Sequence, residues 1–242
     1  MNLIIDVGNT FVKFAVFNKA KLKDKFVGKI TDFEIIIEDV LKTYPKINQA
    51  IVSSVGKLKT SHIEILKSEV KVLELSHKLK LPFENLYATP KTLGVDRIAL
   101  VSASVQQFPE NNVLVIDAGT CITYDFINVN NEYLGGAISP GIRLRYKALN
   151  NLTANLPLLD TKLPEDILGG STQNSIHSGV VFGVLKEIDG VIAEYGEKYS
   201  DLTIILTGGD TKFLANQLKN SIFANSNFLL EGLNFILEYN SQ

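Results

Sequence analysis

The feature that most constrains the fold is a strand-turn-strand pattern that occurs twice, nearly half the chain apart. The first copy is an apolar run ending at Asp6, then Val7-Gly8-Asn9-Thr10, then a second apolar run from Val12. The second copy reads Val115-Ile116-Asp117-Ala118-Gly119-Thr120 and continues with a β-branched run from Ile122. A repeated unit of this size predicts two lobes of similar construction.

Short β-branched runs alternate with longer amphipathic segments in both halves, which predicts an α/β fold with mixed sheets flanked by helices. We place the boundary between the lobes near residue 111, so that they span 1–111 and 112–242. No Gly/Ser-rich linker separates them, and we expect them to pack around a cleft. The expected strands are Leu3–Asp6, Val12–Asn18, Ala50–Val55, Val70–Glu74, Val113–Asp117, Ile122–Val129 and Leu202–Thr207. The expected helices are Thr31–Tyr44, Ser61–Lys67, Thr92–Phe108, Ser171 to about Tyr199, Thr211–Asn220 and Leu230–Tyr239.

Composition excludes several classes of protein. A chain of 242 residues with 45% hydrophobic content is long enough for two cores, and its net charge of −2 argues against a basic nucleic-acid binder. No apolar run reaches the roughly 20 residues that span a bilayer, and the N-terminus lacks the basic region of a signal peptide. With one cysteine, Cys121, and three scattered histidines, neither an intramolecular disulfide nor a His/Cys metal cluster is expected. We expect a cytoplasmic protein that binds neither nucleic acid nor membrane.

Both Asp-x-Gly turns carry the groups that bind phosphate. Glycine lets the backbone approach a ligand closely, the N–H groups and the threonine hydroxyl can donate to phosphate oxygens, and the aspartate can hold a hydrated Mg²⁺ or another cation. Lys13, just past the first turn, adds a point charge. One such turn is typical of an ordinary hairpin, but two copies in equivalent places favour phosphate binding.

Three further motifs allow both a structural and a functional interpretation. Thr207-Gly208-Gly209 follows an apolar strand and suits either a nucleotide or a strand-to-helix turn. Gly135–Gly141 is expected to be a loop that lines the cleft or connects two elements. In Gly94-Val95-Asp96-Arg97, the carboxylate can accept a proton and the guanidinium can grip an anion, although an aspartate also suits any helix N-terminus.

These motifs, in this order, resemble the type III pantothenate kinase family within the sugar kinase, Hsp70 and actin superfamily. The matching segments are Asp6–Thr10, Gly94–Arg97, Asp117–Thr120, Gly135–Gly141 and Thr207–Gly209, and they span nearly the whole chain. The resemblance implies two ribonuclease H-like lobes and ATP-dependent phosphorylation of pantothenate, the first step towards coenzyme A. No P-loop, dinucleotide fingerprint or protein-kinase motif set points elsewhere.

The resemblance also implies roles for particular residues. Asp96 would be the general base, Asp117 the ligand of a monovalent cation such as K⁺ or NH₄⁺, and Asp6 would lie near Mg²⁺. The implied ATP-binding residues are Asp6, Val7, Gly8, Asn9, Thr10, Phe11, Val12, Lys13, Thr120, Gly208 and Gly209. The implied pantothenate-binding residues are Tyr87, Gly94, Val95, Asp96, Arg97 and Thr172, of which Tyr87 also suits a packing role and Thr172 a helix N-cap.

The resemblance also implies a homodimer, and Gly179 and Gly183 on the long predicted helix suit close helix approach between or within chains. The chain departs from the expected pattern at Arg143-Leu144-Arg145, where we expect a less basic helix start. Two other functions remain open at this point. One is another small-molecule kinase of the same superfamily, and the other is a nucleotide-binding regulatory accessory protein.

Overall fold

Two mixed sheets organise the chain, and each belongs mainly to one of two units. The computed structural model describes residues 1–8, 11–54 and 58–241. The first unit comprises residues 1–109, 131–133 and the segment from Asn227 to the C-terminus. The second unit comprises residues 110–130 and 134–226. The cleft expected between the lobes stays a prediction.

The sheet of the first unit has the order β3-β2-β1-β4-β5. Strands β1 and β2 pair antiparallel, as do β2 and β3, whereas β1 pairs with β4 in parallel and β4 with β5 in parallel. The strands are β1 Asn2–Val7, β2 Val12–Asn18, β3 Lys21–Gly28, β4 Gln49–Ser54 and β5 Lys71–Glu74. β3 was not expected from the sequence, because its alternation of exposed and half-buried residues includes four charged side chains.

The sheet of the second unit repeats that order. Its strands run β11-β10-β7-β8-β9-β6, so that β9-β8-β7-β10-β11 corresponds to β3-β2-β1-β4-β5. β7 and β8 pair antiparallel and β7 and β10 in parallel, as their counterparts do. The strands are β6 Glu84–Asn85, β7 Asn112–Ala118, β8 Cys121–Ile127, β9 Glu132–Pro140, β10 Leu202–Thr207 and β11 Phe223–Ala224. The internal repeat predicted from the sequence is therefore confirmed at the level of topology.

Helices cover both faces of the first sheet. Alternate residues of β1, such as Leu3 and Ile5, pack in one core with Phe33 and Ile37 of α1. On the opposite face, Asn2 donates to the side chain of Asn234 in α8 at 2.7 Å, because successive strand side chains point to opposite faces. The helices of this unit are η1 Ile30–Asp32, α1 Phe33–Thr43, α2 Thr60–Glu69, η2 Pro90–Thr92, α3 Val95–Gln107 and α8 Phe228–Tyr239.

Helix α8 belongs to the first unit although the sequence boundary at residue 111 assigns it to the C-terminal lobe. A Cβ added to Gly232 of α8 would lie 1.9 Å from the backbone oxygen of Ala99 in α3. The two helices therefore touch backbone to backbone, and this contact accounts for the return of the chain to the first unit. No sequence motif near residue 232 indicates its distant partner.

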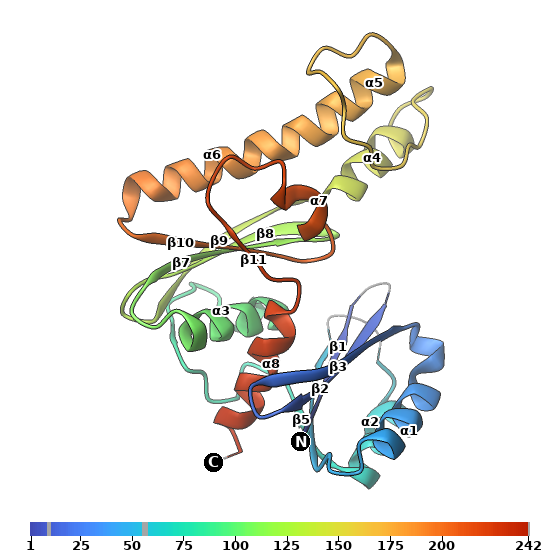
Figure 1. The fold of residues 1–242 in the computed structure, drawn as a ribbon, viewed down its shortest axis with the longest axis vertical. Helices are drawn as coiled ribbons and strands as arrows, with labels where there is room; N and C mark the ends of the chain where they lie inside the picture. Colours follow the sequence, from blue (N-terminus) through green and yellow to red (C-terminus); the bar gives the residue numbers. More distant parts are fainter. Residues whose placement is uncertain (9–10, 55–57, 242) are drawn as a thin grey trace. The chain divides into compact units, whose positions relative to one another are not determined.

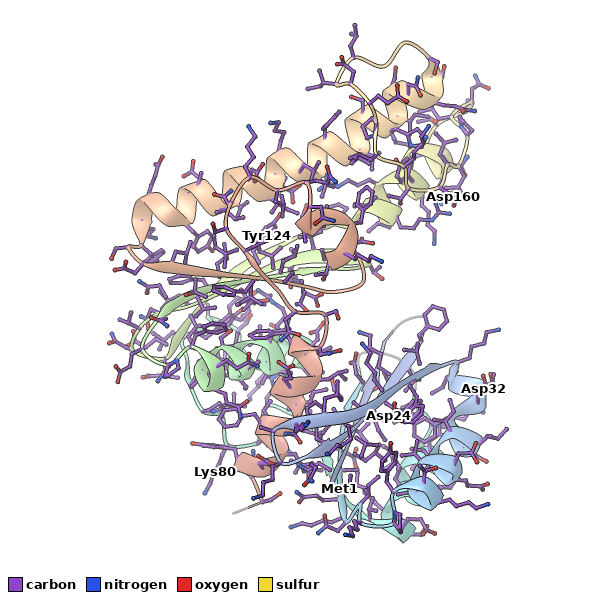
Figure 2. All side chains as sticks on the ribbon, in the orientation of Figure 1. Met1, Asp24, Asp32, Lys80, Tyr124 and Asp160 are labelled. Carbon is purple, nitrogen blue, oxygen red and sulfur yellow. The ribbon has the colours of Figure 1, made fainter. Side chains whose placement is uncertain are left out.

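In the second unit one long helical stretch runs along the sheet (Figure 1). It consists of α5 Thr172–His177, a π-helical turn η3 Ser178–Phe182, and α6 Gly183–Lys198, which confirms the helix expected from Ser171 to about Tyr199. Val184, Ile188 and Ile192 recur at helical spacing and pack on β7, β8 and β10. Tyr124 of β8, labelled in Figure 2, belongs to the same core. The other helices are α4 Ile142–Asn151 and α7 Thr211–Ala215.

The prediction of a loop over Gly135–Gly141 is wrong. Residues up to Pro140 belong to strand β9, and Gly141 is the N-cap of helix α4. The glycines mislead because they are usually rare in strands, whereas here Gly135 takes a φ of 117° that only glycine adopts easily. Within the described part of the chain, no helix has both the length and the apolar character needed to cross a bilayer.

Candidate active site

The first Asp-x-Gly turn closes the β1–β2 hairpin. Val7 and Val12 form the last cross-strand pair, and the Gly8 N–H donates to the Phe11 oxygen at 3.1 Å. Both valines are buried in the core, so they can offer a ligand only backbone groups. Phe11 is half exposed. Asn9 and Thr10, two of the predicted ATP-binding residues, lie outside the described residues.

Asp6 and Lys13 are opposite each other in this hairpin. They are cross-strand partners, and the lysine Nζ lies 3.4 Å from the aspartate Oδ2. Burial raises the pKa of Asp6, and the attraction and hydrogen bond of Lys13 oppose that rise. The negative charge of Asp96 raises the pKa of Asp6 further. The structure therefore brings the carboxylates of Asp6 and Asp96, which are ninety positions apart in sequence, within electrostatic reach inside one unit.

Ser53 is a residue of this region that the sequence motifs do not single out. It is fully buried on β4 as the parallel partner of Asp6, so both side chains point to the same face of the sheet. Its hydroxyl makes no hydrogen bond to any residue that the structure describes. Only the pairing register of β1 with β4 connects this serine to the turn.

The Gly94–Arg97 motif forms the N-terminus of helix α3, with Gly94 as N-cap and Val95 as the first helical residue. The Asp96 carboxylate accepts from the Arg97 backbone N–H at 2.9 Å. A Cβ on Gly94 would lie 2.4 Å from the same carboxylate oxygen. Glycine leaves room here for the aspartate to fold back, and a larger residue would displace the carboxylate.

Arg97 and Tyr87 lie together, as the resemblance implies for two residues of one substrate site. The Arg97 guanidinium carbon lies 5.8 Å from the centre of the Tyr87 ring, a cation–π arrangement. Arg97 is 5% exposed although it sits in the first turn of a helix. A buried guanidinium beside an aromatic ring is a suitable partner for a ligand carboxylate.

The second Asp-x-Gly turn gathers four of the predicted residues in the second unit. The Gly119 N–H donates to the Cys121 oxygen at 2.9 Å, and Thr120 at the tip is exposed. Gly208 has a φ of +96°, and a Cβ there would lie 2.3 Å from the Ala118 oxygen and 2.4 Å from Asp117 Oδ1. The Thr207–Gly209 turn is thus pressed against the Asp117–Thr120 turn, and Gly209 beside it is exposed.

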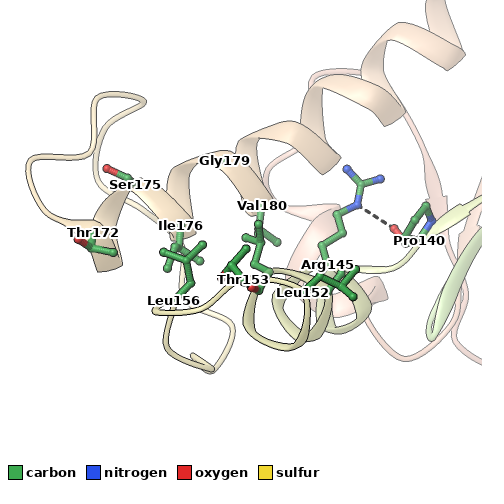
Figure 3. A pocket seen from close by; sticks show the side chains of 12 residues that line it. Pro140, Arg145, Leu152, Thr153, Leu156, Thr172, Ser175, Ile176, Gly179 and Val180 are labelled. Carbon is green, nitrogen blue, oxygen red and sulfur yellow. Dashed lines mark hydrogen bonds between the residues drawn. The ribbon is translucent and has the colours of Figure 1, made fainter.

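Thr172 lies elsewhere in the second unit, on the edge of an apolar groove of about 910 Å³ between helices α4, α5 and η3. The groove is lined mainly by aliphatic side chains, among them Leu149, Leu152, Leu156, Ile176 and Val180. Figure 3 shows Thr172 at one end of the groove and Pro140 at the other. Thr172 is not the N-cap of α5, because the Ser171 hydroxyl accepts from the Asn174 N–H.

The donor sets at the two turns fit ions that keep most of their water. Among the described residues, no group of three or more His, Cys, Asp or Glu side chains could hold a metal ion. Each turn instead offers one aspartate, Asp6 or Asp117. Mg²⁺ commonly binds in this way, with one or two carboxylates, several waters and the phosphate oxygens of a substrate.

Comparison with known proteins gives a consistent result. The model of the type III pantothenate kinase family matches residues 2–194. A protein of Christiangramia forsetii named type III pantothenate kinase is 53% identical over 240 residues, which cover 99% of each chain. Among solved structures, a Campylobacter jejuni protein described as a Baf family transcriptional activator is 25% identical to this chain, with a TM-score of 0.61. The match covers 99% of this chain and 98% of that chain. The glucokinase of an Antarctic psychrotroph shares the fold at 14% identity, with a TM-score of 0.54 and 98% of each chain covered.

Proposed function

The chain belongs to the type III pantothenate kinase family, and on that premise we propose which of its residues carry out the reaction. The family transfers a phosphate to pantothenate in coenzyme A biosynthesis, and its kinase chemistry uses ATP and a divalent metal ion. Two Asp-x-Gly turns in equivalent places of two mixed sheets suit the nucleotide side of that reaction. The Gly94–Arg97 helix start suits the acceptor side.

Asp96 is the proposed general base. The observation that supports this role is that the charge of Asp96 acts on Asp6 within the same unit, as expected of a proton acceptor near the turn that would hold the phosphates. A hydroxyl held there would lose its proton to Asp96 as its oxygen bonds to the γ-phosphorus of ATP, while the bond from that phosphorus to the bridging oxygen breaks and ADP leaves. Phosphoryl transfer depends mainly on positioning and charge stabilisation, so the placement of the carboxylate is its main contribution.

Arg97 and Tyr87 are the proposed partners of pantothenate. The buried Arg97 guanidinium would pair with the substrate carboxylate, and the Tyr87 ring would limit its movement. The backbone of Gly94 and Val95 would contact the rest of the molecule. With its carboxylate held by Arg97, pantothenate would be oriented so that its hydroxyl lies near Asp96.

At the first turn, the proposed donors to ATP are the Lys13 ammonium and the Gly8 N–H. The other proposed ATP contacts are the backbone of Val7, Phe11 and Val12, and the residues Asn9 and Thr10. Lys13 is 42% exposed on its side chain, so it can leave Asp6 for a phosphate oxygen. Asp6 would then be free to bind Mg²⁺. The metal ion would neutralise charge on the phosphates.

At the second turn, Thr120 is the proposed hydroxyl donor to phosphate, and the backbone at Gly208 and Gly209 the proposed nucleotide contact. Asp117 is the proposed ligand of a monovalent cation, K⁺ or NH₄⁺. The close approach of Gly208 to Asp117 supports one shared site, because a Cβ on Gly208 would lie only 2.4 Å from Asp117 Oδ1.

A homodimer is the proposed assembly, and a second copy of the chain the proposed cover of the apolar groove. Leu152 in the lining of the groove is 83% exposed, and an exposed apolar surface of this kind suits a protein interface. Thr172 on the edge of the groove would then act at a pantothenate site that includes the second copy. Light scattering should give twice the chain mass of 26.7 kDa, and a mass of one chain would exclude the dimer. A cytoplasmic location also stays a prediction.

The experiment that tests the general base is an assay of ADP release in K⁺ buffer, with and without pantothenate. Asp96→Asn should lower kcat by about 10²-fold or more while ATP binds as before. Asp32→Asn is the matched control, because Asp32 is an exposed aspartate that precedes helix α1 of the same unit; its turnover should match the wild type. Full turnover by Asp96→Asn would exclude the base role, and equal rates without K⁺ or NH₄⁺ would exclude the role of Asp117.

A further inference from the structure

The basic segment Arg143-Leu144-Arg145 contains two arginines with different surroundings. Arg143 donates to the Leu159 oxygen at 2.6 Å and pairs with Asp160, whose side chain is 98% exposed. Arg145 is only 21% exposed and pairs with Glu187 of α6. Two residues apart on a helix, the side chains point to nearly opposite sides. Only Arg145 faces the sheet of the second unit.

Arg145 joins α4 to α6 and to the end of β9. Its Nε donates to the Pro140 oxygen at 2.8 Å, a bond drawn in Figure 3. Its Nη2 donates to the Ser139 hydroxyl at 3.0 Å and to Glu187 Oε2. The planar guanidinium can hold these three acceptors at once, which a lysine ammonium does less rigidly.

Glu187 is held as a carboxylate by this network. Burial by itself would raise the pKa of Glu187, but hydrogen bonds from Arg145, Ser139 and Tyr124 outweigh it and lower the pKa. The Tyr124 hydroxyl donates to Glu187 Oε1 at 2.9 Å. Arg145 is therefore tied to Glu187 on α6, and Glu187 is tied in turn to the buried Tyr124 on β8.

The same network reaches the second Asp-x-Gly turn through Gly141. The Gly141 N–H donates to the Thr120 oxygen at 3.0 Å, and the Arg145 N–H donates to the Gly141 oxygen at 3.0 Å. A Cβ on Gly141 would lie 2.1 Å from the Gly119 oxygen, so the start of α4 lies directly against the turn. A shift of Pro140 or Gly141 would be transmitted to Thr120.

We propose that Arg145 is a positioning residue that holds Thr120 in its phosphate-binding orientation by tying Pro140 and Gly141 to helix α6. Arg145 touches no substrate in this role. The proposal rests on the proposed function, in which Thr120 binds the phosphates of ATP. It predicts a defect in ATP binding rather than in the acceptor site.

The test measures the Kd of ATP by titration calorimetry without pantothenate, and both KM values in the ADP-release assay. Arg145→Met should weaken ATP binding about ten-fold and raise KM for ATP to match, while KM for pantothenate stays within two-fold. Arg145→Lys keeps the charge without the planar guanidinium, and its Kd for ATP should lie between those of Arg145→Met and wild type. Arg143→Met is the matched control from the same helix, and its ATP affinity should equal that of the wild type.

Several results would overturn the proposal. One is a folded Arg145→Met protein that melts at a lower temperature but binds ATP within two-fold of wild type, because the network would then be structural only. A rise in KM for pantothenate alone would place Arg145 at the acceptor site instead. If Arg145→Met does not fold, the folded Arg145→Lys protein serves instead, and wild-type ATP affinity in that protein would refute the positioning role of Arg145. Wild-type protein without pantothenate-dependent turnover would instead refute the proposed function.

Discussion

Gly208→Ala should damage the second phosphate turn far more than the same change at its neighbour Gly209. The φ of Gly208 is +96°, and its Cβ would lie 2.3 Å from the backbone oxygen of Ala118. At Gly209 no atom lies within 4 Å of an added Cβ, and the backbone is outside the left-handed region. The two adjacent glycines therefore form a matched pair that differs in backbone conformation and space.

The expected magnitude follows from two contributions. An alanine with left-handed backbone costs roughly 1–2 kcal/mol. Forcing a methyl group against a backbone oxygen in a packed region costs roughly 1–3 kcal/mol more, because the Ala118 carbonyl has to move. The sum, about 3 kcal/mol, corresponds to a fall in Tm of about 10 °C for a chain of this size. Gly209→Ala should change the free energy of unfolding by less than about 0.5 kcal/mol.

The assay is a thermal melt of both variants beside wild type, repeated with saturating ATP. Gly208→Ala should also gain less thermal stabilisation from ATP than wild type does, because the displaced turn binds the nucleotide less well. If the two variants melt within 2 °C of each other, the reasoning from φ and from the Cβ contacts is refuted.

Two further predictions concern stability alone. The pKa of Glu187 is lowered from its ordinary value of 4.5, so its ionised form stabilises the fold above that pH, and this contribution disappears as the pH falls through the lowered pKa. Glu187→Gln should therefore lower Tm at pH 7, and the difference in Tm from wild type should shrink as the pH falls below 4.5 and through the lowered pKa; a constant difference would contradict the ionised network. Gly232→Ala should cost at least about 2 kcal/mol, because its Cβ would lie 1.9 Å from the Ala99 oxygen. Gly190→Ala, in an exposed helical position with no atom within 4 Å, should instead gain up to about 1 kcal/mol in a urea titration, and equal effects at the two glycines would refute the helix contact.

The turns were predictable from the sequence because their chemistry is local. A buried strand, an acidic residue and a glycine follow one another in each copy, and no distant residue is needed to recognise them. The same holds for the long helix, since Val184, Ile188 and Ile192 recur every four residues. Gly94 and Asp96 are also neighbours in sequence, so their shared turn was visible in the motif.

Strand β9 was not predictable, because its formation depends on distant residues and not on a local pattern. A strand that contains two adjacent glycines lacks the side chains that strand patterns rely on, and its pairing depends on β8 and on residues far away in the chain. The sequence also did not predict β3, because the charged residues that alternate along it resemble those of a loop.

By itself the sequence determined the two turns, their repetition, the α/β class and the family, because each depends on residues close together or on an ordered set of short motifs. Only the tertiary structure decided that Ser53 lies beside Asp6, that Asp96 acts on Asp6, and that Arg145 is tied to Glu187. Strand register, helix docking and backbone contacts set these pairs. They arise when the whole core packs, and no local pattern contains them.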